Sequence, residues 1–320
     1  MKSALVTGGA GFIGSHLCED LLGRNYKVTC LDNLYTGSKK NISSLLKDKN
    51  FRFIKGDVLN KSLVQKLVKQ ADTIYHLAAV VGVEEVMRNP VENISVNTGG
   101  IINVAECTFK YDKRVVFASS SEVYGKNSIA PLEEDKSESI FGSTSINRWA
   151  YGHAKAIGEH VLYGYAEMGL RMTIVRYFNS YGPRSKNPRY ANVIPKFIRQ
   201  AIDNKNITVY GNGQQTRCFC YVKDTARGTI LAGESDKSLS QVINIGSDKE
   251  ITIKRLAEEI IKLTSSKSKI EYIKEDRVFD KKFESSNRRV PSIKKAKKLL
   301  GFSPKLTLRE GLQQTIVWYQ

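Results

Sequence analysis

The segment TGGAGFIG at residues 7–14 constrains the fold more than any other part of this chain. It joins a short apolar run to a longer amphipathic stretch, a pattern that predicts a strand, a turn and a helix. Gly8 allows the tight turn, Gly11 lets the backbone approach a pyrophosphate, and Gly14 lets the helix pack closely on the strand. The helix N-terminus adds free N–H groups and a favourable dipole for phosphates. The pattern therefore predicts a dinucleotide site.

Short β-rich runs alternate with helical stretches through the first half of the chain. The predicted strands are 4–7, 28–32, 51–54, 73–77, 114–119 and 172–178, and the helices include 13–25, 60–70 and 96–111. Nearly all-apolar strands separated by helices indicate a parallel sheet covered on both faces. We therefore predict an α/β fold with a doubly wound Rossmann sheet in residues 1–180, to which the chain returns around 217–250.

The pattern changes after about residue 180, where a loop rich in Pro, Gly and Arg begins. Residues 181–320 are predicted to form mainly a smaller mixed α/β domain that binds the substrate. Its expected elements are helix 193–203, strand 207–210, helix 225–233, helix 253–264, strand 270–273 and helix 292–300. The highly charged run 274–289 is predicted to be a loop.

Composition narrows the class of protein. The net charge is +18, but the lysines are spread along the chain without a nucleic-acid motif, which favours anionic small molecules over nucleic acid. No apolar run is long enough to span a membrane, and no signal peptide is evident. Five scattered cysteines suggest reduced thiols in the cytoplasm and no metal site; Cys218 and Cys220 are expected to face the same way on one strand.

Asp32 points to the identity of the cofactor. It ends the second predicted strand, where its carboxylate can accept hydrogen bonds from the adenosine ribose. No Arg follows it immediately, which favours NAD over NADP.

Tyr151 and Lys155 form the candidate catalytic pair. On a helix, residues four apart share a face. A phenol has a free pKa of about 10, so it needs a neighbouring positive charge to act as a base near neutral pH. Lys155 and a nicotinamide ring supply such charge, and Tyr151 can then take a hydroxyl proton as hydride leaves the same carbon. Ser120 and Ser121 lie in a serine-rich strand end, and a serine hydroxyl there can relay that proton.

Several motifs together resemble the extended short-chain dehydrogenase/reductases that act on nucleotide sugars. They are TGGAGFIGSHL, HLAA (76–79), SSSEVYG, the Tyr151/Lys155 pair, RYFNSYGPR (176–184), TVYGNGQQTRCFCYVKD (208–224) and the tail 288–304. The resemblance covers essentially the whole chain. It implies an NAD-dependent enzyme that oxidises a nucleotide sugar, typically UDP-linked, at C4.

The resemblance also implies roles for individual residues. Phe12, Ile13 and Asn33 join the glycines and Asp32 around NAD, Asp57 and Val58 flank its adenine, and Leu77, Ala78, Ala79 and Asn97 line it. Ser120 matches the catalytic Ser/Thr position. Asn179, Asn192, Arg217 and Arg289 match positions that hold the substrate diphosphate, Thr208 and Tyr210 match positions around the base, and Arg184 is a candidate for a substrate carboxylate.

Family members usually dimerise through the helices that carry Asn97 to Tyr111 and Tyr151 to Tyr165, so a homodimer is expected. The second helix has an apolar stripe compatible with packing, formed by Ala154, Ile157, Val161 and Leu162. The alternative use of this stripe is burial within one subunit.

Glu122 is the residue that distinguishes the possible reactions. Epimerases of this family usually carry a small or neutral residue there, whereas dehydratases and decarboxylases carry an acid. A 4-epimerase only turns the 4-keto sugar over, but a dehydratase or decarboxylase needs an acid or base near C5. The single acid after Ser121 favours a UDP-glucuronate decarboxylase-like enzyme. A UDP-sugar 4-epimerase and an NDP-sugar 4,6-dehydratase remain alternatives, and the complete Tyr/Lys/Ser set disfavours a non-catalytic NAD-sensing or RNA-binding protein.

Overall fold

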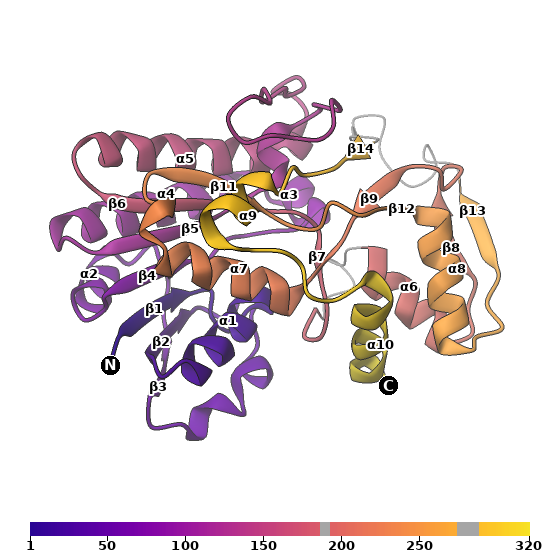
Figure 1. The fold of residues 1–320 in the computed structure, drawn as a ribbon, viewed down its shortest axis with the longest axis horizontal. Helices are drawn as coiled ribbons and strands as arrows, with labels where there is room; N and C mark the ends of the chain where they lie inside the picture. The colour runs from indigo at the N-terminus through magenta and orange to yellow at the C-terminus, as the bar shows by residue number, and fades with distance from the viewer. Residues whose placement is uncertain (186–192, 274–287) are drawn as a thin grey trace.

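A seven-stranded parallel sheet forms the centre of the computed structural model, which describes residues 1–185, 193–273 and 288–320 (Figure 1). In spatial order the strands are β11 (Gln241–Ile245), β6 (Arg171–Tyr177), β5 (Arg114–Ser120), β4 (Thr73–His76), β1 (Ser3–Thr7), β2 (Lys27–Asp32) and β3 (Phe51–Lys55). The strand order runs outward in both directions from β1 and β4. Such a reversal creates a crevice at the carboxyl ends of the strands.

Helices cover both faces of this sheet. One face carries α1 (Phe12–Gly23), α7 (Val222–Glu234) and α9 (Lys294–Leu300), and the other carries α2 (Lys61–Lys69), α4 (Pro90–Lys110) and α5 (Ala150–Glu167). Neighbouring strand residues point to opposite faces, so Val6 joins the first core and Leu5 the second. This two-sided burial explains why the strands are almost entirely apolar.

A smaller part lies beside the carboxyl ends of the strands (Figure 1). Its helices α6 (Val193–Ile202), α8 (Ile253–Thr264) and α10 (Leu308–Tyr319) share an apolar core with the parallel strands β8 (Ile207–Tyr210) and β13 (Ile270–Ile273). Two small sheets connect it to the rest: β12 (Glu250–Thr252), β9 (Thr216–Cys218) and β14 (Arg288–Arg289) form one, and β7 (Ser180–Tyr181) and β10 (Cys220–Tyr221) form the other.

The structure confirms the α/β class and all six strands predicted in the first half, and it corrects details elsewhere. Helix α4 begins at Pro90, several residues before the predicted start, and α3 (Val83–Arg88) was not predicted. The prediction that Cys218 and Cys220 lie on one strand was wrong. The run divides between β9 and β10, which pair with different partners. Most of the charged run 274–289 and Asn192 lie outside the described residues. Among the described helices, none is long and apolar enough to cross a membrane.

Candidate active site

The glycine loop leaves no space for side chains where a cofactor would lie. Gly8 has a φ of +70°, and a Cβ there would stand 2.7 Å from the backbone nitrogen of Ala78. A Cβ on Gly14 would lie 2.1 Å from the carbonyl oxygen of Gly8, so only glycine lets the first turn of α1 pack against the end of β1. This close packing brings the N-terminus of α1 to the edge of the crevice.

A cavity of about 220 Å³ lies at the carboxyl ends of β1, β2, β4 and β5. Every residue predicted to contact the cofactor, except Asn97, lines it: Gly8, Gly11, Phe12, Ile13, Gly14, Asp32, Asn33, Asp57, Val58, Leu77, Ala78, Ala79, Tyr151 and Lys155. Asn97 instead lies behind the wall, where its amide group bonds to both the nitrogen and the oxygen of Val80. The glycine loop, the N-terminus of α1 and Asp32 in this lining suit a dinucleotide.

Asp32 is held rigidly at the rim of the cavity. One carboxylate oxygen accepts a hydrogen bond from the Ala10 nitrogen at 2.9 Å, and the other accepts one from the Leu34 nitrogen at 2.8 Å. Burial raises the pKa of this carboxyl, and the two backbone donors oppose that shift. Each oxygen keeps a further lone pair for a ribose hydroxyl. Nearby, the Asn33 amide donates to Asp57, which fixes the pair predicted beside the adenine.

Tyr151 and Lys155 both face the same cavity from α5. Burial and the charge of Glu122 raise the pKa of the Tyr151 phenol, and a hydrogen bond with Ser120 lowers it. The buried Lys155 ammonium donates to the carbonyl oxygen of Ala118 at 2.8 Å. Burial lowers the pKa of Lys155 to about 7, against the opposing charge of Glu159. The Tyr151 phenol, the Ser120 hydroxyl and the Lys155 ammonium therefore meet at one wall of the cavity.

A buried ion pair supports this wall from behind. Glu159 lies one turn after Lys155 on α5, and its carboxylate accepts from both Arg176 and the Ser119 hydroxyl. The bidentate contact with the guanidinium fixes the spacing between α5, β5 and β6. The predictions from sequence missed Glu159 and Arg176, because only the fold brings the two residues together.

Glu122 lies between two guanidinium groups. Arg289 contacts one carboxylate oxygen, and Arg148 contacts the other at 2.8 Å. These two charges lower the pKa of Glu122 to about 2, although burial alone would raise it. The carboxylate is therefore ionised at neutral pH. Ser121, predicted as a catalytic candidate, is buried, while the hydroxyl of Ser120 also accepts a hydrogen bond from the Glu122 nitrogen.

Two short strands bring further cations to Glu122. Arg289 on β14 pairs in register with Arg217 on β9. Burial lowers the pKa of Arg217, with Arg289 and Arg148 contributing through repulsion and Glu122 opposing them. The structure thus gathers Glu122, Arg148, Arg217 and Arg289. Arg148 was not predicted as a site residue, although it stands three positions before Tyr151.

The remaining predicted substrate residues lie at different distances from this group. Asn179 lies close to Arg217 in space, because its amide donates to the Cys218 carbonyl oxygen at 2.9 Å. Thr208 and Tyr210 lie on β8, where they bond to Gln200 and Lys196 of α6. They lie in the smaller part of the molecule.

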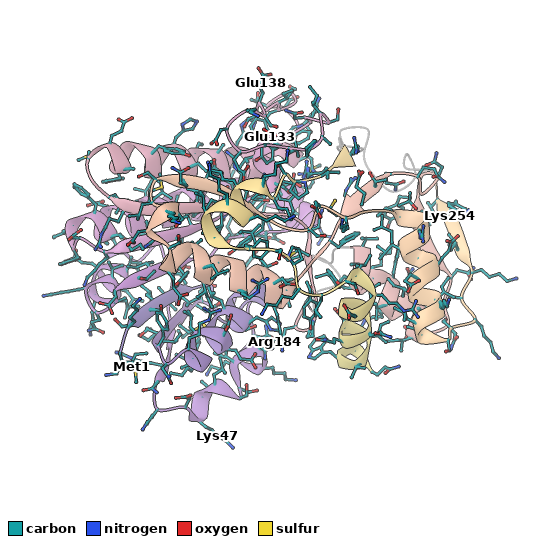
Figure 2. All side chains as sticks on the ribbon, in the orientation of Figure 1. Met1, Lys47, Glu133, Glu138, Arg184 and Lys254 are labelled. Carbon is teal, nitrogen blue, oxygen red and sulfur yellow. The ribbon has the colours of Figure 1, made fainter. Side chains whose placement is uncertain are left out.

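Arg184 is not part of the arginine group, as we call Arg148, Arg217 and Arg289 around Glu122. It forms an ion pair with Glu19 of α1 at 2.7 Å, and Figure 2 labels Arg184 beside that helix. The backbone next to it bonds to His16 of the same helix, through the Pro183 carbonyl oxygen. In this structure Arg184 therefore contacts the cofactor helix.

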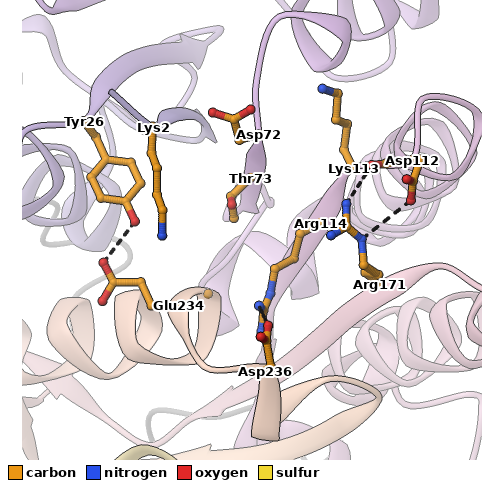
Figure 3. A pocket seen from close by; sticks show the side chains of 11 residues that line it. Lys2, Tyr26, Asp72, Thr73, Asp112, Lys113, Arg114, Arg171, Glu234 and Asp236 are labelled. Atoms are coloured by element: carbon orange, nitrogen blue, oxygen red, sulfur yellow. Dashed lines mark hydrogen bonds and ion pairs between the residues drawn. The ribbon is translucent and has the colours of Figure 1, made fainter.

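A second cleft, of about 420 Å³, lies at the opposite edge of the sheet (Figure 3). Its charged residues largely pair with each other: Arg114 with Asp236, Arg171 with Asp112, and Tyr26 with Glu234. Ligands of doubly wound sheets bind at the carboxyl ends of strands, whereas this cleft lies at the amino ends. The described residues contain no group of three or more His, Cys, Asp or Glu side chains arranged to hold a metal ion.

Comparisons with known proteins agree with this geometry. The family model described as the NAD dependent epimerase/dehydratase family matches residues 4–246. The chain is 43% identical over 319 residues to UDP-N-acetyl-alpha-D-glucosaminuronate decarboxylase of Bacillus cytotoxicus, covering 100% of this chain and 98% of that protein. It is 36% identical to UDP-glucuronic acid decarboxylase 1 of Danio rerio, covering 99% of this chain and 72% of that protein.

A solved structure extends the comparison to the fold. The crystal structure of UDP-glucuronic acid 4-epimerase from Bacillus cereus, in complex with UDP-glucuronic acid and NAD, matches with a TM-score of 0.87 and 31% identity. The match covers 99% of this chain and 98% of that one. Together with the glycine loop and the Tyr151/Lys155 pair, these matches show that the chain belongs to the NAD-dependent epimerase/dehydratase family and is an NAD-dependent enzyme that modifies nucleotide sugars.

Proposed function

We propose that this enzyme decarboxylates a UDP-linked uronic acid. The observation that carries the proposal is the ionised Glu122 carboxylate held between Arg148 and Arg289 beside Tyr151. The names of two relatives, both decarboxylases of UDP-linked uronic acids, support the same reaction.

The first step is oxidation at C4 of the sugar. Tyr151 accepts the proton of the C4 hydroxyl, and Ser120, which bonds to the phenol, orients that hydroxyl. Lys155 stabilises the phenolate through its positive charge. The glycine loop and Asp32 would hold NAD, which would supply the acceptor for the hydride of C4 and its donor after the second step. Tyr151 then gives the proton back to the C4 oxygen.

The second step follows from the chemistry of a 4-keto uronic acid. The bond between C5 and the carboxylate breaks, CO₂ leaves, and the electron pair forms an enolate with the C4 ketone. A proton taken from water then adds to C5, which restores the ketone. The positive charges around Glu122 suit a substrate that carries a carboxylate besides its diphosphate.

The ionisation state of Glu122 also favours decarboxylation over dehydration. A 4,6-dehydratase must protonate the leaving C6 hydroxyl, so it needs a group that stores a proton near neutral pH. With its pKa at about 2, Glu122 holds almost no proton there. A 4-epimerase needs no ionised group near C5 at all. We therefore assign Glu122 to the decarboxylation step, where it orients the surrounding guanidinium groups and the substrate.

The test is incubation with UDP-glucuronate, its 2-acetamido counterpart, UDP-glucose and UDP-N-acetylglucosamine, followed by mass measurement of the nucleotide sugar. We expect loss of CO₂ from at least one uronic acid and no loss of mass from the neutral sugars. An unchanged mass with inversion at C4 would support the 4-epimerase, which the solved epimerase complex makes the second candidate. Loss of water would support the dehydratase instead.

We further propose that the enzyme is a homodimer. Helix α4 exposes Ile94 and Ile102, two turns apart, and α5, which packs against α4, exposes Ile157. Of the predicted stripe, Ala154 and Leu162 are buried within the subunit, so only Ile157 and the half-buried Val161 remain for a partner. We also propose that the enzyme works in the cytoplasm, which its five free cysteines support.

A further inference from the structure

We propose that Glu159 is a positioning residue of the oxidation step, where it keeps Lys155 charged and holds the strand end that carries Ser120. The inference rests on the roles proposed for Tyr151 and Lys155, and it holds whichever sugar reaction follows the oxidation. Glu159 lies one turn after Lys155 on α5, a spacing that places both side chains on one face. Both residues are buried. A carboxylate and an ammonium on neighbouring turns interact more strongly inside a protein than in water.

Glu159 bonds to two strands behind the catalytic wall. Its Oε1 atom accepts hydrogen bonds from the Ser119 hydroxyl of β5 and, at 3.0 Å, from Arg176 Nε of β6. Its Oε2 atom accepts from Arg176 Nη2 at 2.6 Å. The same guanidinium lies 4.7 Å from the ring centroid of Tyr124, which is fully buried. Charge-assisted bonds from two directions therefore fix the position of the carboxylate.

Ser119 passes this fixed position on to the catalytic side chains. It lines the cofactor cavity, as Tyr151 and Lys155 do. The residue before it, Ala118, provides the carbonyl oxygen that accepts from the Lys155 ammonium at 2.8 Å. The residue after it, Ser120, bonds to the Tyr151 phenol. A bond to the middle residue of the three therefore positions the partners of both catalytic side chains.

The charge of Glu159 acts on Lys155 as well. Burial lowers the pKa of Lys155 to about 7, and Glu159 is the group that opposes this shift. Without the carboxylate the pKa of Lys155 would fall further, and the side chain would be mostly neutral at pH 7. A neutral Lys155 does not stabilise the Tyr151 phenolate, so the phenol would keep its proton up to a higher pH.

The other ionisable groups around Lys155, in the described part of the chain, keep one charge state near neutral pH. Burial lowers the pKa of His76 on β4 to about 3, so this imidazole is neutral, and burial raises the pKa of Tyr177 on β6. Carboxylates and guanidinium groups stay charged near neutrality. Those from the elements packed against α5 are Glu92, Glu122, Arg148 and Arg176. A pH profile near neutrality therefore reports on Tyr151 and Lys155.

The experiment measures the oxidation step across pH. NAD-loaded protein is mixed with UDP-glucuronate, or with the nucleotide sugar that the wild type oxidises in its place, and absorbance gives the rate of NADH formation in a single turnover. In Glu159→Gln the rate at pH 7 should fall about 10-fold and the midpoint of the profile should rise by about one pH unit, which are equivalent changes. Glu167→Gln, an exposed carboxylate on the same helix, is the matched control and should leave both unchanged.

Breaking the ion pair from its other side separates charge from structure. Arg176→Gln also removes the bidentate contact but leaves the carboxylate next to Lys155, so the midpoint should fall or stay in place. A midpoint that rises in both variants, or that stays in place in Glu159→Gln, would overturn the inference. Glu159→Asp keeps the charge one carbon further back and should give a smaller rise. It carries the test if Glu159→Gln does not fold, and no rise would then reject the inference.

The outcome is independent of the reaction that follows the oxidation. A raised midpoint in Glu159→Gln, together with an unchanged sugar mass in the wild-type assay, would support the inference and reject decarboxylation. Loss of CO₂ in the wild type, together with an unmoved midpoint in Glu159→Gln, would reject the inference and keep the decarboxylase.

Discussion

The Tyr151 phenol cannot act as a base on its own in this environment. Burial and the negative charge of Glu122 both raise its pKa, while Lys155, with a pKa of about 7, is only partly charged near neutrality. The positive nicotinamide ring of bound NAD would add to the partial charge of Lys155 and so favour the phenolate. Proton removal therefore depends on the cofactor being in place, which restricts the chemistry to the loaded enzyme.

Replacing Tyr151 tests this role directly. Tyr151→Phe should reduce turnover by about 10²- to 10⁴-fold, the usual contribution of a positioned base, with little change in stability. Steady-state turnover and thermal unfolding measure the two effects. Glu138→Gln on the exposed loop is a suitable control and should behave like the wild type. Retention of more than about a tenth of the wild-type turnover would show that another group takes the proton.

Asp32 should determine the choice between NAD and NADP. A 2′-phosphate would approach a buried carboxylate whose backbone donors hold it in place, so it could not move aside. Juxtaposed like charges cost several kcal/mol, so NAD should bind at least about 100-fold more tightly than NADP. Fluorescence titration of the apo protein gives both affinities. Equal affinities would contradict the role given to Asp32.

Glu122 makes stability depend on pH in a defined direction. Its pKa is about 2 in the folded protein, below the ordinary value of 4.5 that it takes in the unfolded chain, so the folded state favours the ionised form. The ion pairs therefore stabilise the fold fully above pH 4.5, and this contribution falls as the pH drops toward 2. The unfolding free energy of Glu122→Gln at pH 7 should be lower than that of the wild type by roughly 3 kcal/mol.

Urea unfolding at pH 7, 4.5 and 3.5 tests this prediction. The difference between wild type and Glu122→Gln should shrink by about 1.4 kcal/mol for each pH unit below 4.5. A constant difference over this range would mean that Glu122 contributes through packing and not through its charge.

Motifs located most of the site at the residue scale, but not its ion pairs. The glycine loop, Asp32 and the Tyr151/Lys155 pair are local signals, and all of them line one cavity. The contact between Glu122 and Arg289 joins residues 167 positions apart, and no local pattern reports such a pair. Arg148 was missed for the same reason: its value comes from Glu122, which only the fold brings next to it.

Helix α5 serves two purposes with two faces. Tyr151, Lys155 and Glu159 follow a four-residue spacing that directs them toward the sheet and the cavity. Ile157 lies on the opposite side and is 45% exposed. In the proposed dimer, a change in the contacts of this outer face would therefore act on the helix that carries the catalytic pair.

The outer face gives a prediction about assembly. Ile157→Arg should convert the proposed dimer into a monomer at micromolar concentration, because a charge in an apolar contact is strongly unfavourable. Light scattering after size-exclusion chromatography measures the mass. Val317→Arg on α10 is a matched control, since Val317 is also exposed but lies in the other part of the molecule. A wild-type protein that is monomeric would reject the dimer.

Elements with strong periodicity were predicted well, and short ones were not. Helix α8 and strands β8 and β13 have the predicted bounds, because caps and alternation mark them. Strands β7, β10 and β14 contain two residues each, too few for any pattern to show. Strand β14 places Arg289 opposite Arg217 of β9, so the sequence named Glu122, Arg217 and Arg289 as site residues but did not predict the strand pairing that brings the two arginines together.

The charge of the whole molecule fits its ligands. A net charge of +18 accompanies a nucleotide sugar and a dinucleotide that are both anionic. Composition predicted an anionic small molecule, but the position of the charges required the fold.

The path of the chain between the two parts has a consequence for how the protein responds to proteolytic cleavage. After β6 the chain enters the smaller part, returns through α7 and β11 to the central sheet, leaves again for α8, comes back at α9 and ends in α10 (Figure 1). The chain therefore crosses several times between the two parts and links them covalently at each crossing. A protease that nicks any one crossing should leave both fragments associated and active, and they should separate only in denaturant. Gel filtration of nicked protein, followed by denaturing electrophoresis, would show this.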